Sequence, residues 1–329
     1  MGRGIGFGKT ILFGEHFVVY GLEGIPAAIG DTTTAQVERI HGKIGYDLID
    51  NRPATTGYKE EKKGEYEPLL RRIIDYMQLT EKIKITLNGN LFCASGVGAS
   101  AACAVAVARA INDEYKLKWN DYQINKAAFE GETAGSGTPS GIDNTVATYG
   151  GFLYFKKNLT GGENQITPVK IKQPIEIVLG NTGKTALTKE VVGDVKIQKE
   201  SDPDAMQKIF DNYNLVVTSA KKAISEYDLK KLGELMNQNQ ILLRQINVSC
   251  KESEDIISAA NSAGALGAKI TGTGRGGLVI CLTPGKDLQE KVAKAIKAKG
   301  YEVTKTTIGW IEKCKLNHLV CGEWCQKML

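Results

Sequence analysis

The chain has 329 residues, 42% of them hydrophobic and 24% charged, a balance typical of a globular protein long enough for two domains. Its net charge of +5, from 42 basic and 37 acidic residues, comes without a basic stripe alternating with aromatics, which argues against a nucleic-acid partner and favours small anionic ligands such as nucleotides. No apolar run approaches the roughly 18 residues of a membrane span, and Met1–Gly8 lacks the layout of a signal peptide.

Residues 4–10 read GIGFGKT and have the composition of a phosphate-binding P-loop. A P-loop needs four residues between its glycines, whereas Gly4 and Gly8 enclose three and no strand signal precedes them. We therefore do not expect this run to bind phosphate.

Two β-rich runs follow, Ile11–Phe13 and Phe17–Tyr20, and a Gly-Glu-His sequence interrupts them. Lys9, Glu15 and His16 thus lie on or beside strands that we expect to be buried. Because an ionised group is costly to bury without a partner, each predicts an ion pair or a ligand. His16 alone would be read as a satisfied core histidine, but the cluster of three favours a site.

The next part of the chain alternates strand and helix signals. Residues 32–58 mix short strand signals with turns, and Gly64–Gln78 carries one apolar face that predicts a helix. A strand over Lys84–Phe92 then leads into a loop rich in small residues, and a helix over Ala101–Ile111 leads out of it. This strand–loop–helix unit is the best candidate for a ligand site.

Glycines at 96 and 98 let the loop turn tightly and approach a ligand closely. The helix that follows presents free N–H groups and the positive end of its dipole to an anion. Ser100 lies in the first turn, where its hydroxyl can cap the helix or bind a metal ion. Taken alone, the loop is equally compatible with a plain strand-to-helix turn.

A second polar stretch follows a predicted helix that begins at Asn120 or Asp121 and ends near Glu132. Glu132 and Asp143 flank a turn rich in glycine and hydroxyls. Ser140 is expected to cap a short helix with Asp143 in its first turn. Glycines alone would indicate a loop, but two acids flanking such a turn favour a site.

The second half begins with strands at Gly151–Phe155 and Ile175–Gly180. The polar segment between them, Lys156–Gln173, is our candidate boundary and divides the chain into domains 1–172 and 173–329. The later predicted elements are helices at 204–226, 229–248, 253–263 and 287–299 and strands at 278–282 and 301–309. Gly272, Gly274 and Gly277 match a dinucleotide-binding spacing, but a strand follows where that fold needs a helix, so we predict a glycine hairpin.

The last twenty residues contain Cys314, His318, Cys321 and Cys325. Intervals of four, three and four place all of them on one helix face, and a straight helix cannot arrange them around one tetrahedral zinc. The seven cysteines of the chain are irregularly spaced, which predicts reduced thiols and a cytoplasmic location.

Three stretches together, within residues 9–280, resemble the three ordered motifs of the GHMP kinases. The first of them, KTILFGEHFVVYG at residues 9–21, is similar to the mevalonate kinase branch, because Phe-Val-Val follows Gly-Glu-His where galactokinases have Thr-Asp-Tyr. The resemblance implies an α+β fold with two domains, an N-terminal ribosomal-protein-S5-like domain and a C-terminal ferredoxin-like α/β sandwich, with the active site in the cleft between them.

The resemblance also implies roles. Asp143 is expected to accept the proton of the attacking hydroxyl, Lys9 to pair with Asp143, and Ser100 and Glu132 to bind Mg²⁺. Glu15 and His16, with Asp143, are expected to line the mevalonate side, and Gly272 and Gly274 to support the phosphate loop. The ATP phosphates are expected to lie on Ser95, Gly96, Val97, Gly98, Ala99, Ser100 and Ala101.

The activity implied is ATP-dependent phosphorylation of the 5-hydroxyl of mevalonate for isoprenoid biosynthesis, by a monomer or homodimer open to inhibition by isoprenoid diphosphates. A phosphomevalonate or other small-alcohol kinase is an alternative, and so is a ligand-sensing homologue without catalysis, although Lys9, Glu132 and Asp143 argue against the latter.

The sequence departs from the family pattern at four positions. Cys93 stands where a proline usually opens the phosphate loop, and Ala99 replaces the first of two usual serines. Ser136 stands where many members of the mevalonate kinase branch have histidine, and Arg275 replaces a glycine.

Overall fold

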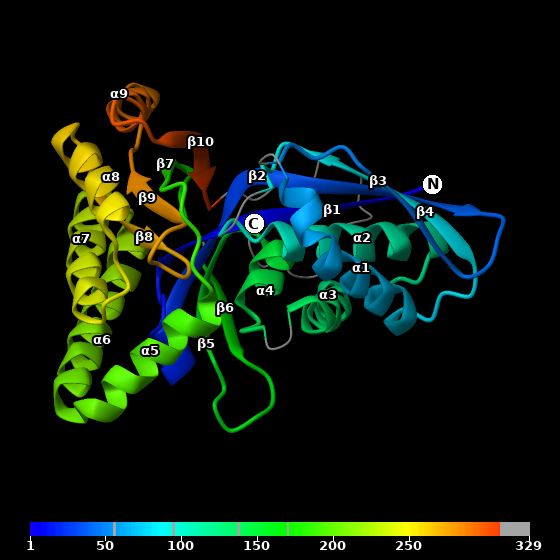
Figure 1. Ribbon diagram of the computed structural model, residues 1–329, viewed down its shortest axis with the longest axis horizontal. Helices are drawn as coiled ribbons and strands as arrows, with labels where there is room; N and C mark the ends of the chain where they lie inside the picture. The colour runs from blue at the N-terminus through cyan, green and yellow to red at the C-terminus, as the bar shows by residue number, and fades with distance from the viewer. Residues whose placement is uncertain (55–56, 94–95, 137–138, 170, 310–329) are drawn as a thin grey trace. The chain divides into compact units, whose positions relative to one another are not determined.

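The structure is a computed structural model that describes residues 1–54, 57–93, 96–136, 139–169 and 171–309 (Figure 1). Its contacts define two compact units, and each is described here by itself. Unit 1 contains residues 1–9 and 28–150, and unit 2 contains residues 10–27 and 151–309. The strands β1 (Gly2–Phe13) and β2 (Glu23–Ile40) contribute residues to each unit.

Unit 1 is a mixed sheet with helices on one face (Figure 1). β2 pairs with β1 and, antiparallel, with β4 (Lys82–Gly89), which pairs in parallel with β3 (Gly45–Asp50). The helices are α1 (Tyr58–Tyr76), α2 (Ala99–Tyr115), α3 (Asp121–Ser136) and α4 (Ile142–Tyr149). Apolar side chains of β2, β4, α1, α2 and α3 form one core cluster. The predicted strand–loop–helix unit is thus confirmed, as β4 followed by α2.

The glycine-rich run at residues 4–10 is part of strand β1. A Cβ atom at Gly4 would lie 2.1 Å from the carbonyl oxygen of Ala106, and one at Gly6 would lie 2.1 Å from that of Ala102. These glycines therefore let α2 approach the strand backbone directly. The rejection of a P-loop here is confirmed.

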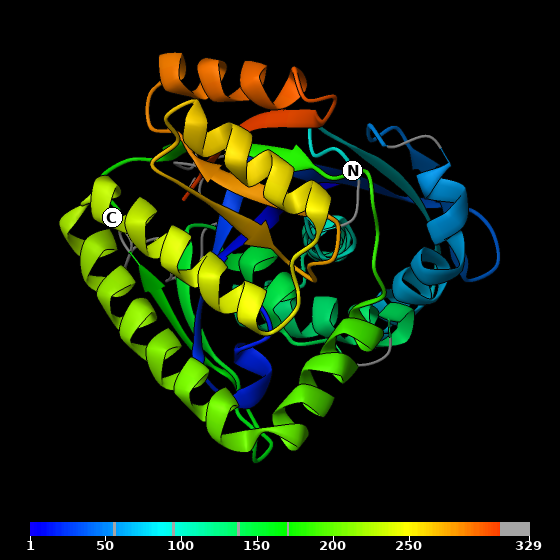
Figure 2. The same ribbon diagram turned by 60° about the vertical axis from the view of Figure 1, so that its left-hand side comes forward.

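Unit 2 contains an antiparallel sheet in the order β10-β7-β9-β8. Helices α7, α8 and α9 pack on this sheet, and α6 packs on α7 (Figure 1 and Figure 2). The strands are β5 (Phe152–Lys156), β6 (Gln165–Val169), β7 (Ile175–Asn181), β8 (Gly267–Thr271), β9 (Leu278–Leu282) and β10 (Glu302–Ile308). The helices are α5 (Thr188–Ser201), α6 (Pro203–Glu226), α7 (Leu229–Gln245), α8 (Lys251–Ser262) and α9 (Lys286–Lys297). α5 was not predicted, whereas the glycine hairpin between β8 and β9 is confirmed.

The expectation of a strand over Phe17–Tyr20 is wrong. Val18–Tyr20 forms a 3₁₀ helix, η1, and Phe17 stacks on Tyr213 of α6 with ring centroids 3.9 Å apart and planes inclined by 11°. The β-rich composition of Phe17–Tyr20 correctly indicated burial. Packing against Tyr213 determined its backbone conformation, as is common for β-branched and aromatic residues.

The polar segment Lys156–Gln173 is more than a connection, because it contains β6, which pairs antiparallel with β5. Pro168 is tolerated there because β6 is an edge strand. The domain division at residue 172 stays a prediction. None of the helices within the described ranges is both long and apolar enough to cross a membrane.

We predict that Gly6→Ala lowers the free energy of unfolding by about 1–3 kcal/mol or more, because the new Cβ atom forces α2 away from β1. Denaturant unfolding measures this change. Gly64→Ala is the matched control: it lies within α1 with no atom within 4 Å of the added Cβ, so it should raise stability by about 0.5–1 kcal/mol. Equal stabilities of the two variants would contradict the close packing.

Candidate active site

The glycine-rich loop of unit 1, which is expected to bind phosphate, leads from Cys93 into α2. Gly98 precedes the helix with φ of 69°, and a Cβ atom there would lie 2.8 Å from Cγ of Lys9. The N–H of Lys9 donates to the carbonyl of Val97 at 2.9 Å. Gly98 therefore serves two purposes, since it turns the chain into the helix and leaves room for the lysine. Ser95 lies outside the described residues.

The first turn of α2 follows at once and contains Ala99, Ser100 and Ala101. Helix geometry leaves the N–H groups of a first turn without partners in the helix. They are therefore available to an anion, and the helix dipole favours negative charge at this end. Gly96 and Val97 complete the described part of the loop.

The structure brings Lys9 and Asp143 together, as predicted. Lys9 Nζ lies 3.1 Å from Asp143 Oδ1, with the lysine side chain only 6% exposed and the aspartate side chain 38% exposed. Asp143 lies in the first turn of α4, as predicted, but the N-cap of this helix is Gly141, with φ of 84°, and not Ser140. Ser140, one residue earlier, accepts the N–H of Ile142 with its Oγ at 3.3 Å. A buried cation thus holds a carboxylate that still faces solvent.

Glu132, on α3, is the second acid of this cluster and is 7% exposed. Burial raises the pKa of its carboxyl to about 7, and the nearby charge of Asp143 adds to the rise. A hydrogen bond with Ser100 and the charge of Lys9 oppose it. Ser100, Glu132, Asp143 and Lys9 therefore form one interacting group in unit 1.

In unit 2, Glu15 pairs with a residue that the sequence analysis missed. Lys269 Nζ lies 2.5 Å from Glu15 Oε1, and both side chains are wholly buried. The same ammonium donates to the carbonyl of Ile270 at 2.6 Å. Burial lowers the pKa of Lys269, and the carboxylate of Glu15 opposes that shift. The signal was a lysine within the otherwise small and apolar strand β8, where only a buried partner could compensate its charge.

His16 follows Glu15 and is also buried, with a left-handed backbone at φ of 63°. Its Nε2 lies 2.7 Å from the carbonyl of Thr273. Burial lowers the pKa of His16, outweighing that hydrogen bond, and the charge of Arg275 lowers it further. The neutral ring must donate from Nε2 to the carbonyl, so Nδ1 is an acceptor. Within the described residues this buried Nδ1 has no partner.

The glycine turn between β8 and β9 contains Gly272 and Gly274. Thr271, just before it, accepts the N–H of Ile11 at 2.9 Å and lies 3.1 Å from the hydroxyl of Thr10. Thr273, within it, lies 2.7 Å from the Thr188 hydroxyl. The turn is therefore tied to the chain that carries Glu15 and His16.

The site residues named from the sequence thus fall into two groups, one in each unit. Lys9, Glu132, Asp143 and the glycine-rich loop belong to unit 1, and Glu15, His16, Gly272 and Gly274 belong to unit 2. In the described parts of the chain, no three His, Cys, Asp or Glu side chains gather as a metal centre. The tail residues Cys314, His318, Cys321 and Cys325 lie outside the described residues.

The chain was compared with known proteins. Family models for the N-terminal domain and the C-terminal part of GHMP kinases match residues 67–151 and 220–302. The mevalonate kinase of Thermococcus sibiricus is 37% identical over 313 residues, covering 89% of this chain and 91% of that protein. The mevalonate kinase of Pyrococcus abyssi is 35% identical over 315 residues with the same coverage. The crystal structure of L. major mevalonate kinase in complex with R-mevalonate matches with a TM-score of 0.89 at 38% identity, covering 94% of this chain and 96% of that one.

Both matched models define a GHMP kinase, with its mixed α/β fold. Because the relatives are 35% and 37% identical over nearly their whole length, the chain belongs to the mevalonate kinase family. The family implies ATP as the co-substrate.

We predict that Lys269→Met lowers the free energy of unfolding by about 3–5 kcal/mol, because it removes the cation paired with the buried carboxylate of Glu15. Adding Glu15→Gln should recover part of the loss, since the buried carboxylate charge is then removed as well. Lys305→Met, which breaks an exposed pair with Glu290, is the control and should leave the denaturant midpoint nearly unchanged. Similar losses in both single variants would contradict the buried pairing.

Proposed function

We propose that this chain transfers the γ-phosphoryl group of ATP to the 5-hydroxyl of mevalonate, giving 5-phosphomevalonate for isoprenoid biosynthesis. The pairing of buried Lys9 with half-exposed Asp143, beside the phosphate loop, carries the proposal. The names of the relatives, and the mevalonate bound in the L. major structure, support the choice of acceptor.

Asp143 is the proton acceptor in this proposal. Its carboxylate is open to solvent on one side and fixed by Lys9 on the other, so an acceptor hydroxyl has access to it. The ammonium of Lys9 stabilises negative charge as the hydroxyl oxygen loses its proton and attacks phosphorus. Such placement and charge stabilisation supply most of the catalysis in phosphoryl transfer.

The residues present fit a magnesium ion. A hydroxyl and a buried carboxylate, Ser100 and Glu132, interact at the start of α2. A buried carboxylate beside a second acid calls for a compensating cation, and Mg²⁺ commonly takes few protein oxygens and completes its shell with water and phosphates. When bound with ATP, the ion neutralises charge that develops on the phosphate oxygens. The chain's own contribution is to hold the phosphates on the N–H groups of residues 96–101.

We assign His16 to binding of the acceptor substrate, with Glu15 in a supporting role. The free Nδ1 of His16 accepts a hydrogen bond from a substrate hydroxyl, and its ring is held by the Thr273 carbonyl. Glu15, in its buried pair with Lys269, fixes the turn from which His16 projects. Gly272 and Gly274 support this side through the turn that contains Thr273.

We also propose a cytoplasmic location, in keeping with the free thiols of Cys93, Cys103, Cys250 and Cys281. The family resemblance further suggests a monomer or homodimer, with isoprenoid diphosphates competing for the ATP site. Both expectations are open to direct measurement, by sedimentation and by inhibition kinetics against ATP.

A substrate panel with coupled detection of ADP tests the function. We expect turnover with R-mevalonate that chelation by EDTA abolishes and added Mg²⁺ restores. Turnover of phosphomevalonate without turnover of mevalonate would replace the acceptor in our proposal. Tight ATP binding without turnover of any acceptor would instead favour a ligand-sensing homologue.

We predict that Asp143→Ala lowers kcat by about 10²–10⁴, the usual effect of removing a proton acceptor, with ATP binding largely retained. Steady-state kinetics and calorimetric titration with ATP separate the two quantities. Asp75→Ala, at an exposed position of α1, is the control and should keep wild-type turnover. Near-normal turnover of the Asp143 variant would refute its assigned role.

A further inference from the structure

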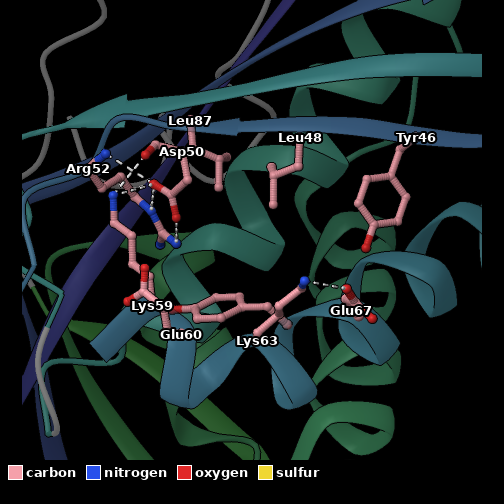
Figure 3. Close-up of a pocket in the computed structure, with 10 residues that line it drawn as sticks. Tyr46, Leu48, Asp50, Arg52, Lys59, Glu60, Lys63, Glu67 and Leu87 are labelled. Atoms are coloured by element: carbon pink, nitrogen blue, oxygen red, sulfur yellow. Dashed lines mark hydrogen bonds and ion pairs between the residues drawn. The ribbon is translucent and has the colours of Figure 1, made fainter. Parts of the chain in front are cut away.

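A cavity of about 410 Å³ lies between strand β3 and helix α1 of unit 1 (Figure 3). Oppositely charged side chains line it beside apolar ones, and at one end Arg52 and Lys59 both reach Asp50 (Figure 3). Arg52 is the notable one, because a guanidinium is seldom buried unless it is fully paired.

Arg52 is 3% exposed, and its contacts are extensive. Nε and Nη2 donate to the two carboxylate oxygens of Asp50 at 3.0 and 2.8 Å. The guanidinium carbon lies 5.1 Å from the ring centroid of Tyr66 on α1. The remaining nitrogen, Nη1, donates to the carbonyl of Ala99 at 3.3 Å. Ala99 is the first residue of α2, so this contact reaches the phosphate loop itself.

The short segment around Arg52 also holds the other end of the loop. The N–H of Cys93 donates to the carbonyl of Pro53 at 2.7 Å, and Ala54 forms an isolated parallel bridge with Cys93. Residues 52–54 therefore contact the loop both where it begins, at Cys93, and where it enters the helix, at Ala99. Asp50, at the end of β3, anchors this segment to the sheet through Arg52.

We propose that Arg52 is a positioning residue for nucleotide binding: it fixes the start of α2 against the end of β3 so that the loop N–H groups are preorganised for the ATP phosphates. The inference rests on the proposed function, since it takes this loop to be the phosphate site. Arg52 acts through the Ala99 carbonyl and the Cys93–Pro53 contact.

The geometry predicts that replacing Arg52 weakens the binding of ATP but not that of mevalonate. Arg52 contacts neither Lys9 nor Asp143 among its hydrogen-bond partners, which are Asp50 and Ala99. Displacing the start of α2 weakens the phosphate contacts directly, whereas Lys9 is held on strand β1 and Asp143 on α4, so the pair that accepts the proton is disturbed less. A residue with a purely structural role would instead lower stability without separating the two substrates.

The test compares Arg52→Lys with Arg109→Lys. Lysine keeps the positive charge but cannot bond both Asp50 and the Ala99 carbonyl in the fork geometry of arginine. Arg109, on α2, is a matched control: it is 7% exposed and bonds Asp121 at 2.6 Å and the carbonyls of Ile5 and Thr148 at 2.9 and 2.7 Å, none of them in the loop. Both variants should lower Tm.

We expect R52K to raise the KM for ATP by about tenfold, in line with loss of one hydrogen bond from a charged donor. Its KM for mevalonate and its kcat should stay within about twofold of wild type, and R109K should change neither KM. An ATP KM that rises no more in R52K than in R109K would overturn the proposal, and so would an equal rise in both KM values of R52K.

If R52K does not fold, Asp50→Asn takes its place, because it loosens the same guanidinium and leaves every loop residue unchanged. The same split between substrates is expected, and its absence would again overturn the proposal. ATP affinity is also measured by calorimetry without an acceptor. A failure of the proposed function, seen as no mevalonate turnover by the wild type, is therefore distinguishable from a failure of this inference.

Discussion

The close approach of α2 to β1 is the constraint on which the site in unit 1 depends. Gly4 and Gly6 meet the carbonyls of Ala106 and Ala102, so two residues along the strand correspond to four along the helix. Continuing this register brings the start of α2 to the next residues of the strand, where Gly98 meets Lys9. Close packing of the two backbones thus sets the glycine-rich loop opposite Lys9. It also explains why a glycine run resembling a P-loop belongs to a strand instead.

The buried ion pairs differ in how far one of the two partners remains exposed to solvent. Lys269 and Glu15 are both wholly buried. In the Arg52–Asp50 and Arg109–Asp121 pairs the arginines are buried and the carboxylates are 16% and 15% exposed. In the Lys9–Asp143 pair the lysine is buried and the carboxylate is more than one-third exposed. This asymmetry fits proton transfer, because the pair is rigid yet one partner is accessible.

The sequence predicted best what depends on neighbouring residues. The loop and helix around Ser100, the short helix of Asp143 and the hairpin at Gly272 all follow from local glycine signals, although the N-cap of the short helix is Gly141 instead of the predicted Ser140. Lys269 was missed because its partner Glu15 lies 254 positions away, and Arg52 because its role depends on contacts with the distant Ala99. The strand prediction for Phe17 was wrong for a related reason. Its backbone conformation depends on stacking against Tyr213, and local propensity does not encode that contact.

The departures from the family pattern can be read in the same physical terms. A proline at position 93 would have no N–H to donate, whereas Cys93 donates one to the carbonyl of Pro53 and so adds a link between the loop and the Arg52 segment. Arg275 takes a left-handed backbone with φ of 50°, which costs an arginine about 1–2 kcal/mol that glycine avoids. Its side chain offsets this strain by pairing with Asp194 and donating to the carbonyl of Asn247 at 2.9 Å. In unit 1 the backbone N–H of Cys93 therefore stabilises a loop where the family pattern has proline. In unit 2 the side chain of Arg275 does the same where the family pattern has glycine.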